Sequence, residues 1–182
     1  PYEDFDLITF TNSFPHIPNP LDTLKLSKEL IKKPSGIICI ESPSSEKMID
    51  EGQYDQIYHQ HMTYLDIYSL NSLCKNLNLK LFDYEISDFH NGSISYFISR
   101  LDSPYQISYR LNDYLKNFNK VDYLSERSEE IFKEKCENHR NRLRKTLRDI
   151  KDKNKSVACV SAPAKGNTIL NYCGLNNNDI MF

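Results

Sequence analysis

Two short apolar runs, Phe5-Asp-Leu-Ile-Thr-Phe10 and Gly36-Ile-Ile-Cys-Ile-Glu41, decide the fold of the first forty residues. Each run is typical of a strand that is buried on both faces of a sheet. The segment between them, Leu21 to Lys33, has apolar residues at helical spacing, and Pro34 ends it. A strand, a helix and a strand of these lengths form a βαβ unit, so we predict a parallel sheet with a right-handed crossover.

Ligands of such sheets bind beyond the carboxyl ends of the strands. In this sequence those ends lead into Thr11 to His16 and Glu41 to Pro43. His16 is therefore a candidate for a functional role. The alternative is a histidine that only packs or caps.

The rest of the chain continues to alternate between predicted helices and strands. These elements are a helix over Asp66 to Leu77, strands over Leu79 to Ile86 and Ser93 to Arg100, a long helix over Ser125 to Lys153, a strand over Ser156 to Val160, and a helix over Thr168 to Cys173 that Gly174 caps. The pair Asn91-Gly92 indicates a tight turn between the two middle strands. The last strand and helix begin a second α/β unit.

The composition is that of an ordinary folded domain. The 182 residues carry 23 Lys and Arg against 25 Asp and Glu, a net charge of −2. Neutralising phosphates requires an excess of basic residues, so this balance excludes a protein that coats nucleic acid. No apolar run reaches the ~18 residues that a membrane span needs. We therefore expect a cytoplasmic protein with neither a nucleic-acid nor a membrane partner.

The five cysteines are odd in number and widely spaced, without a Cys-x-x-Cys pair. Cys136 and His139 lie three residues apart on a predicted helix, but no second pair completes a set of four zinc ligands. We expect reduced, buried thiols and no metal site. His139 itself stands among Arg140, Arg142 and Arg144, and we expect it at the surface.

Both ends of the chain indicate a fragment of a longer protein. It starts at Pro1-Tyr2 without an initiator Met, and it stops at Ile180-Met-Phe182, an apolar triplet typical of the start of a strand. A strand left without its neighbour would invite self-association through the sheet edge.

The densest cluster of functional groups is Tyr54-Asp-Gln-Ile-Tyr-His-Gln-His61. A histidine is the natural general base at neutral pH, and a nearby tyrosine can orient a carbonyl or stabilise an enolate. Tyr58 and His61 are the candidates for these roles. The alternative is a polar cluster that only supports the structure.

Two further segments could bind a ligand. His90 lies beside the Asn91-Gly92 turn, where it could equally stabilise the turn. Ala162-Pro-Ala-Lys-Gly-Asn167 precedes a predicted helix, and backbone N–H groups with a Lys and a Gly suit a phosphate. The alternative is a plain helix N-terminus, and the spacing is not that of a Walker loop.

Four blocks in this order resemble one known family, the S-adenosylmethionine-dependent C-methyltransferases that methylate nucleotide-linked ketodeoxysugars. The blocks are Asn12-Ser-Phe-Pro-His-Ile-Pro18, Tyr54 to His61, His90-Asn-Gly-Ser93, and Ala162-Pro-Ala-Lys-Gly-Asn-Thr-Ile-Leu-Asn-Tyr-Cys-Gly174. The resemblance covers nearly the whole chain, and the last block is its most specific part.

The resemblance implies a fold, a cofactor and a set of site residues. The fold would be α/β: a truncated doubly wound methyltransferase sheet with a two-stranded extension (1–103), a long helical connector (104–154) and the start of a C-terminal α/β domain (155–182). The cofactor would be S-adenosylmethionine, bound weakly or not at all by this chain alone, which would then show no turnover. His61 would be the base, with Tyr58 nearby and His16 beside the substrate. The implied substrate-binding residues are Asn12, Gln60, His90, Lys165, Gly166, Asn167 and Thr168.

Two positions depart from the family pattern. The family usually has Glu where this chain has Gln60, and it often has Gly and Arg near Asn91 and Ser95. A Glu would raise the pKa of a neighbouring histidine, and an amide would not. A related O- or N-methyltransferase, or a binding domain that kept the fold without catalysis, is therefore an alternative.

Overall fold

The computed structural model describes residues 4–88, 92–118, 125–160 and 163–181. The chain divides into two compact units. The sheet unit comprises Pro1–Glu46 and Gln60–Lys120, and the helical unit comprises Lys47–His59 and Val121–Phe182. The predicted divisions at 103/104 and 154/155 stay predictions. Among the described residues, no helix combines the length and the apolar character needed to cross a bilayer.

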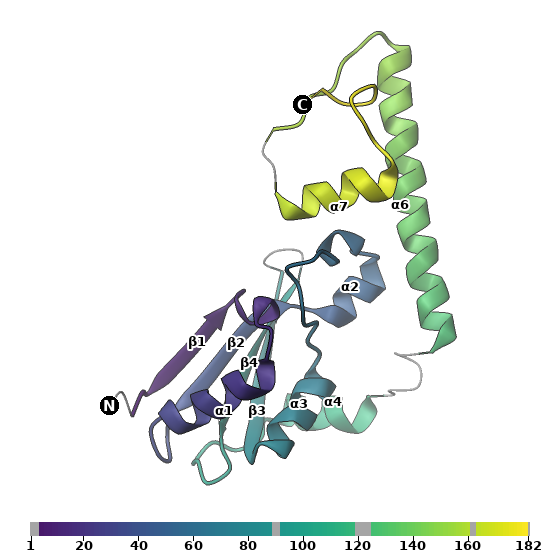
Figure 1. Cartoon of the computed structure of the whole chain (residues 1–182). Coiled ribbons are helices and arrows are strands. Elements are labelled where there is room, and N and C mark those ends of the chain that lie inside the picture. The colour runs from purple at the N-terminus through teal and green to yellow at the C-terminus, as the bar shows by residue number, and fades with distance from the viewer. Residues whose placement is uncertain (1–3, 89–91, 119–124, 161–162, 182) are drawn as a thin grey trace. The chain divides into compact units, whose positions relative to one another are not determined.

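The sheet unit contains a four-stranded sheet in the order β1-β2-β4-β3 (Figure 1). Strands β1 (Leu7–Thr11) and β2 (Ile37–Pro43) are parallel and are connected through helix α1 (Pro20–Leu30), which confirms the predicted strand–helix–strand unit. Strands β3 (Leu79–Ser87) and β4 (Ser93–Arg100) form the predicted two-stranded extension. Because β4 pairs antiparallel with β2, the sheet is mixed.

One face of the sheet carries the core. Ile38 and Ile40 of β2 and Tyr96 of β4 are fully buried there, against Leu24 of α1 and Leu70 of α3 (Ile67–Asn76). Side chains of a strand alternate between the two faces, so this face takes every second residue.

The prediction that β1 is buried on both faces is wrong. Ile8 and Phe10 pack against the core, but Leu7 is 55% exposed, and Thr9 and Thr11 are exposed as well. The reason is that β1 is the edge strand of this sheet and its second face is open to solvent in the described structure. An apolar run cannot by itself tell a strand with one covered face from one with two.

Two short helices and a bulge were not predicted individually, although α4 lies within the predicted helical connector. Helix α2 (Ser45–Glu51) follows β2 and continues into the helical unit, and α4 (Tyr109–Asn117) follows β4. The β3–β4 register shifts between Leu81 and Asp83, which leaves Phe82 as the extra residue of a bulge.

The helical unit is built on α6 (Glu126–Asp152), which confirms the predicted long helix, with Ser125 as its N-cap. Helix α7 (Ala164–Cys173) ends at Gly174, whose φ of 63° is the predicted left-handed cap. This helix starts four residues earlier than predicted, because Ala164 and Lys165 favour helix and Pro163 precedes them.

The predicted strand over Ser156 to Val160 is wrong. Within the described residues one parallel bridge forms, between Ala158 and Met181, with Cys159 N–H donating to the Met181 carbonyl at 3.1 Å and Met181 N–H donating to the Val157 carbonyl at 2.8 Å. A strand needs a partner several residues long, and the described pairing is confined to this bridge.

Candidate functional site

The carboxyl ends of β1 and β2 are joined by Asn12 and Glu41. Asn12 has a φ of 50°, a left-handed conformation that asparagine tolerates better than most residues. Its backbone N–H donates to the Glu41 carbonyl at 2.9 Å, and its side-chain Nδ2 donates to Glu41 Oε1 at 2.8 Å. Because the NH₂ group of Asn12 donates to the Glu41 carboxylate, the side-chain amide is oriented by this bond, and its oxygen is the atom that can accept a hydrogen bond from a ligand.

A single turn of 3-10 helix, η1 (Phe14–His16), follows this strand end. Phe14 is fully buried and packs edge-on against Phe10, with ring centroids 5.4 Å apart. The Pro15 carbonyl accepts from the backbone N–H groups of Met62 and Thr63 at 2.8 and 3.2 Å. These bonds bring Met62 and Thr63, which follow the tyrosine–histidine motif (Tyr54 to His61), to the end of β1.

The result is a pair of histidines. The ring centroids of His16 and His61 lie 5.0 Å apart with an interplanar angle of 50°, and the ring of Tyr64 lies 6.0 Å from that of His61. Both rings are accessible, since His16 is exposed and His61 is half-buried. The structure therefore brings together two residues that the sequence predicted separately, 45 positions apart.

The tautomer of His16 follows from its hydrogen bond. Nδ1 of His16 lies 2.8 Å from the backbone carbonyl oxygen of Gln60. A carbonyl can only accept, so Nδ1 carries the proton. In the neutral ring the lone pair is then on Nε2, the nitrogen that can take a proton from a substrate.

The far end of the same segment is anchored in the core at Leu65. Its buried carbonyl accepts from Ser45 Oγ at 2.8 Å, from Ser45 N–H at 3.3 Å and from the Tyr96 hydroxyl at 3.2 Å. Asp66 then caps α3 through a capping box with Ser69. The segment that carries His61 is thus held on both sides, by Pro15 and by Leu65.

The remaining predicted site residues lie elsewhere or outside the description. Tyr58 belongs to the helical unit and is half-buried, which raises the pKa of its phenol, so the hydroxyl stays protonated and can donate. Lys165, Gly166 and Asn167 lie in the first turn of α7, followed by Thr168. His90 lies outside the described residues, so its predicted role is untested.

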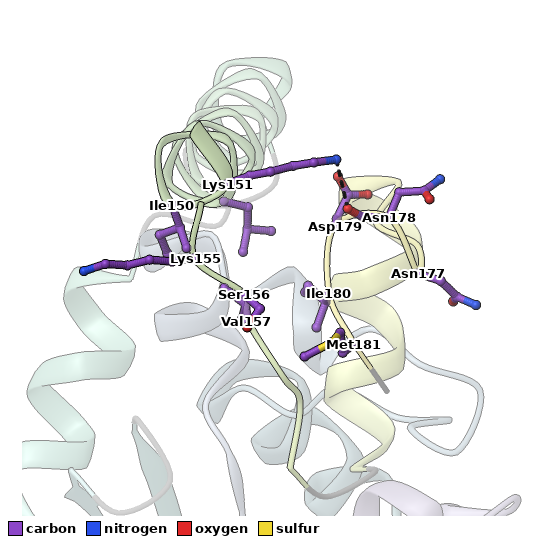
Figure 2. Close-up of a pocket in the computed structure, with 11 residues that line it drawn as sticks. Ile150, Lys151, Lys155, Ser156, Val157, Asn177, Asn178, Asp179, Ile180 and Met181 are labelled. Atoms are coloured by element: carbon purple, nitrogen blue, oxygen red, sulfur yellow. Dashed lines mark hydrogen bonds between the residues drawn. The ribbon is translucent and has the colours of Figure 1, made fainter. Parts of the chain in front are cut away.

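Two cavities in the described part of the helical unit bear on the predicted site. One, of about 160 Å³, lies between the end of α6 and the bridge of Ala158 with Met181, and Lys151 Nζ at its rim donates to the Asn178 carbonyl at 3.2 Å (Figure 2). No residue predicted to be functional lines it. The other encloses about 410 Å³ among mainly apolar side chains, with Gly166 and Asn167 at its wall. The phosphate site predicted at the start of α7 depends on backbone N–H groups and Lys165, which does not line this cavity, so it stays a prediction.

Two features of the structure were not predicted from the sequence. The Glu41 side chain was not singled out, although its position at a strand end was. His139, expected at the surface, is half-buried, and its Nδ1 lies 2.8 Å from the hydroxyl of Tyr54. The signal was its place three residues after buried Cys136, on the apolar stripe of α6.

The chain matches two protein-family models in sequence. Residues 1–83 match one described as a methyltransferase domain, and residues 88–182 match one described as a C-methyltransferase C-terminal domain. The second match covers more than half of the chain. The chain belongs to the C-methyltransferase family. The resemblance predicted from the four sequence blocks is thereby confirmed.

Two known proteins are similar to this chain to different degrees. C-methyltransferase NovU from Streptomyces niveus is 28% identical over 169 residues, which are 93% of this chain and 40% of NovU. The chain thus spans well under half the length of this curated member of the family. A solved structure titled "Conversion of a Disulfide Bond into a Thioacetal Group during Echinomycin Biosynthesis" matches 65% of this chain and 58% of its own, at 9% identity and a TM-score of 0.37.

Proposed function

We propose that the protein containing this chain transfers a methyl group from S-adenosylmethionine to a carbon beside the ketone of a nucleotide-linked sugar, with His61 as the general base. The observation that carries the proposal is the accessible pair of His16 and His61 at the carboxyl ends of parallel strands. Its family supplies the reaction class. We further propose that the four strands are one half of a doubly wound sheet.

The chemistry requires a base and an oxyanion partner. His61 would take the proton from the carbon next to the ketone, and the electron pair of the C–H bond would form an enolate. The enolate carbon would form a new bond to the methyl group, the electron pair of the old S–C bond would stay on sulfur, and the imidazolium would release its proton to water. Tyr58, protonated because of its raised pKa, would donate a hydrogen bond to the enolate oxygen.

His16 would act beside the base. Its Nδ1–H is committed to the Gln60 carbonyl, so Nε2 can accept from a substrate hydroxyl or take the proton itself. The contact uses the backbone of Gln60, so it does not depend on the Glu that the family usually has there. The Gln60 side chain is exposed and would meet the sugar.

The residues at the strand ends fit the methyl donor in part. S-adenosylmethionine, when bound, supplies an electrophilic methyl group on a positively charged sulfur. Glu41 offers a half-buried carboxylate and Asn12 an amide oxygen, and both attract positive charge. These two residues would hold the donor. Lys165 to Thr168 and His90 would meet the nucleotide-linked substrate.

The base step can be tested apart from methyl transfer. The full-length protein is incubated in D₂O with nucleotide-linked ketodeoxysugars and no methyl donor, and NMR follows deuterium entering the carbon beside the ketone. Methylation is then measured with the donor present. His61→Ala should slow both rates by ~10²-fold or more.

His59→Ala serves as the control, because this exposed histidine belongs to the same motif and has no assigned role. It should change neither rate more than threefold. A loss below threefold for His61→Ala, with a large loss for His16→Ala, would transfer the role of base to His16. A methyl group found on oxygen or nitrogen of the product would replace the proposal by the O- or N-methyltransferase alternative.

A further inference from the structure

Within the helical unit, the segment that leads into Tyr58 is fixed at three successive points. The first is Gly52, whose carbonyl accepts a hydrogen bond from the thiol of Cys136 on α6, at 3.8 Å. The second is Tyr54, and the third is Ile57. The 3-10 turn η2 (Tyr54–Gln56) lies between them.

Tyr54 is the central point of attachment. Its side chain is only 6% exposed, and its hydroxyl lies 2.8 Å from Nδ1 of His139 on α6 and 3.4 Å from the Cys173 sulfur on α7. Its ring packs on Tyr172, with centroids 4.3 Å apart. Burial and the hydrogen bond with Cys173 raise the pKa of Tyr54, so the phenol is neutral and able to donate.

Helix α7 is itself braced against α6. Arg144 Nη1 donates to the Cys173 carbonyl at 2.6 Å, at the helix C-terminus, and the Arg140 guanidinium lies 5.6 Å from the ring centre of Tyr172. A cation at these carbonyls also interacts favourably with the helix dipole. The two residues of α7 that contact Tyr54 are therefore held in place from the other side.

The third attachment comes from the block that the sequence singled out as most specific. Thr168 Oγ1 lies 3.5 Å from the Ile57 carbonyl oxygen, at the outer limit of a hydrogen bond. Ile57 is the residue before Tyr58. Helix α7 thus contacts the turn that precedes Tyr58 at two points, through Thr168 in its middle and through Cys173 at its C-terminal end.

We propose that α7 is the support that positions Tyr58, and that Tyr54 and Thr168 are positioning residues for it. The segment 163–174 then serves to hold residues 54–58, in addition to any contact with the nucleotide. The inference rests on the proposed function only in giving Tyr58 a task; the attachment itself can be measured without substrate.

The first measurement is hydrogen exchange of the backbone amides of residues 53–58 in the full-length protein, followed by mass spectrometry. Tyr54→Phe keeps the ring and removes the hydroxyl that His139 and Cys173 share, so these amides should exchange about fivefold faster or more. Tyr105→Phe is the matched control, since it removes a hydroxyl that donates to the Ser35 carbonyl at 2.9 Å in the sheet unit. It should leave residues 53–58 unchanged.

The second measurement is methyl transfer. Tyr54→Phe should lower kcat about tenfold or more while KM for the sugar changes less than twofold, because a misplaced group affects the reaction more than binding. Thr168→Val should lower kcat by a similar factor, and its KM is not part of the test, because Thr168 is also proposed to meet the substrate. Thr168→Ser, which restores the hydroxyl, should recover most of kcat. Unchanged exchange in Tyr54→Phe would overturn the proposal, and so would faster exchange with an unchanged kcat. If the unaltered protein transfers no methyl group, the proposed function fails, while the exchange result still decides whether α7 holds this segment.

Discussion

The ion pair between Asp83 on β3 and Arg110 on α4 allows a quantitative prediction of pH-dependent stability. Arg110 donates Nε to one carboxylate oxygen and Nη2 to the other, each at 2.7 Å, and the Tyr84 N–H adds a third bond. These hydrogen bonds, led by those from Arg110, lower the pKa of Asp83 from 3.8 to about 2.

Such a shift is worth at most about 2.4 kcal/mol of folding free energy, at 1.36 kcal/mol for each pKa unit. The Arg110 side chain is 51% exposed and that of Asp83 is 25% exposed, so solvent screening reduces the expected contribution to about 1 kcal/mol. Because the pKa is lower in the folded state, the contribution is complete above pH 3.8 and is lost as the pH falls through 2.

The assay is urea unfolding, followed by circular dichroism, of the unaltered chain and of Asp83→Asn at several pH values. The unaltered chain should be more stable by about 1 kcal/mol at pH 7, by about half of that near pH 3, and by almost nothing at pH 2. Asp113→Asn is the control, because it removes an exposed carboxylate from α4 without touching the pair. A difference between the unaltered chain and Asp83→Asn that is absent at pH 7, or equally large at pH 7 and pH 2, would refute the reasoning.

Two further predictions concern the space around a glycine and the accessibility of a cysteine. A Cβ at position 36 would lie 2.6 Å from the Lys32 backbone nitrogen and 2.9 Å from the Phe5 carbonyl oxygen. Gly36→Ala should therefore lower the free energy of unfolding in urea by about 1–3 kcal/mol. The control is Gly166→Ala, whose Cβ would lie 3.3 Å from the Pro163 ring and which should lower it by less than about 1 kcal/mol. The second prediction concerns thiol reactivity. Burial raises the pKa of the Cys74 thiol to about 12, whereas Cys159 is exposed. Iodoacetamide at pH 8 should therefore alkylate Cys159 at least ~100-fold faster than Cys74. Peptide mapping measures the two rates, and equal labelling would contradict the buried position of Cys74.

Local patterns predicted the elements that depend on local chemistry. The strands over Leu79 to Ile86 and Ser93 to Arg100 were found within a residue of their observed bounds, because the alternation of apolar and polar residues acts over a few positions. The tight turn predicted at Asn91-Gly92 includes Asn91, which lies outside the described residues. The strand over Ser156 to Val160 was wrong, because pairing depends on a partner far along the chain. The insertion of β4 between β2 and β3 likewise follows from packing rather than from either strand alone.

The candidate site was predictable in its position but not in its geometry. The rule that ligands gather at the carboxyl ends of strands led to the segment Thr11 to His16, and Asn12 was added by the family resemblance. The 5.0 Å approach of His16 to His61 depends on backbone bonds from Met62 and Thr63 to one carbonyl, which no spacing encodes. His139 was misjudged because arginines surround it in sequence, while its partner Tyr54 lies 85 residues away.

The hydrogen bonds to the Leu65 carbonyl have a consequence for the interpretation of variants of this protein. Tyr96 lies on an inner strand of the sheet and is fully buried, yet its hydroxyl donates one of the hydrogen bonds that hold the segment with His61. We therefore expect screens of random variants to yield less active proteins that are altered at Tyr96, a buried residue without access to a ligand. If such variants were ranked by catalytic rate alone, Tyr96 would be mistaken for a catalytic residue, although its role is to hold the backbone near His61.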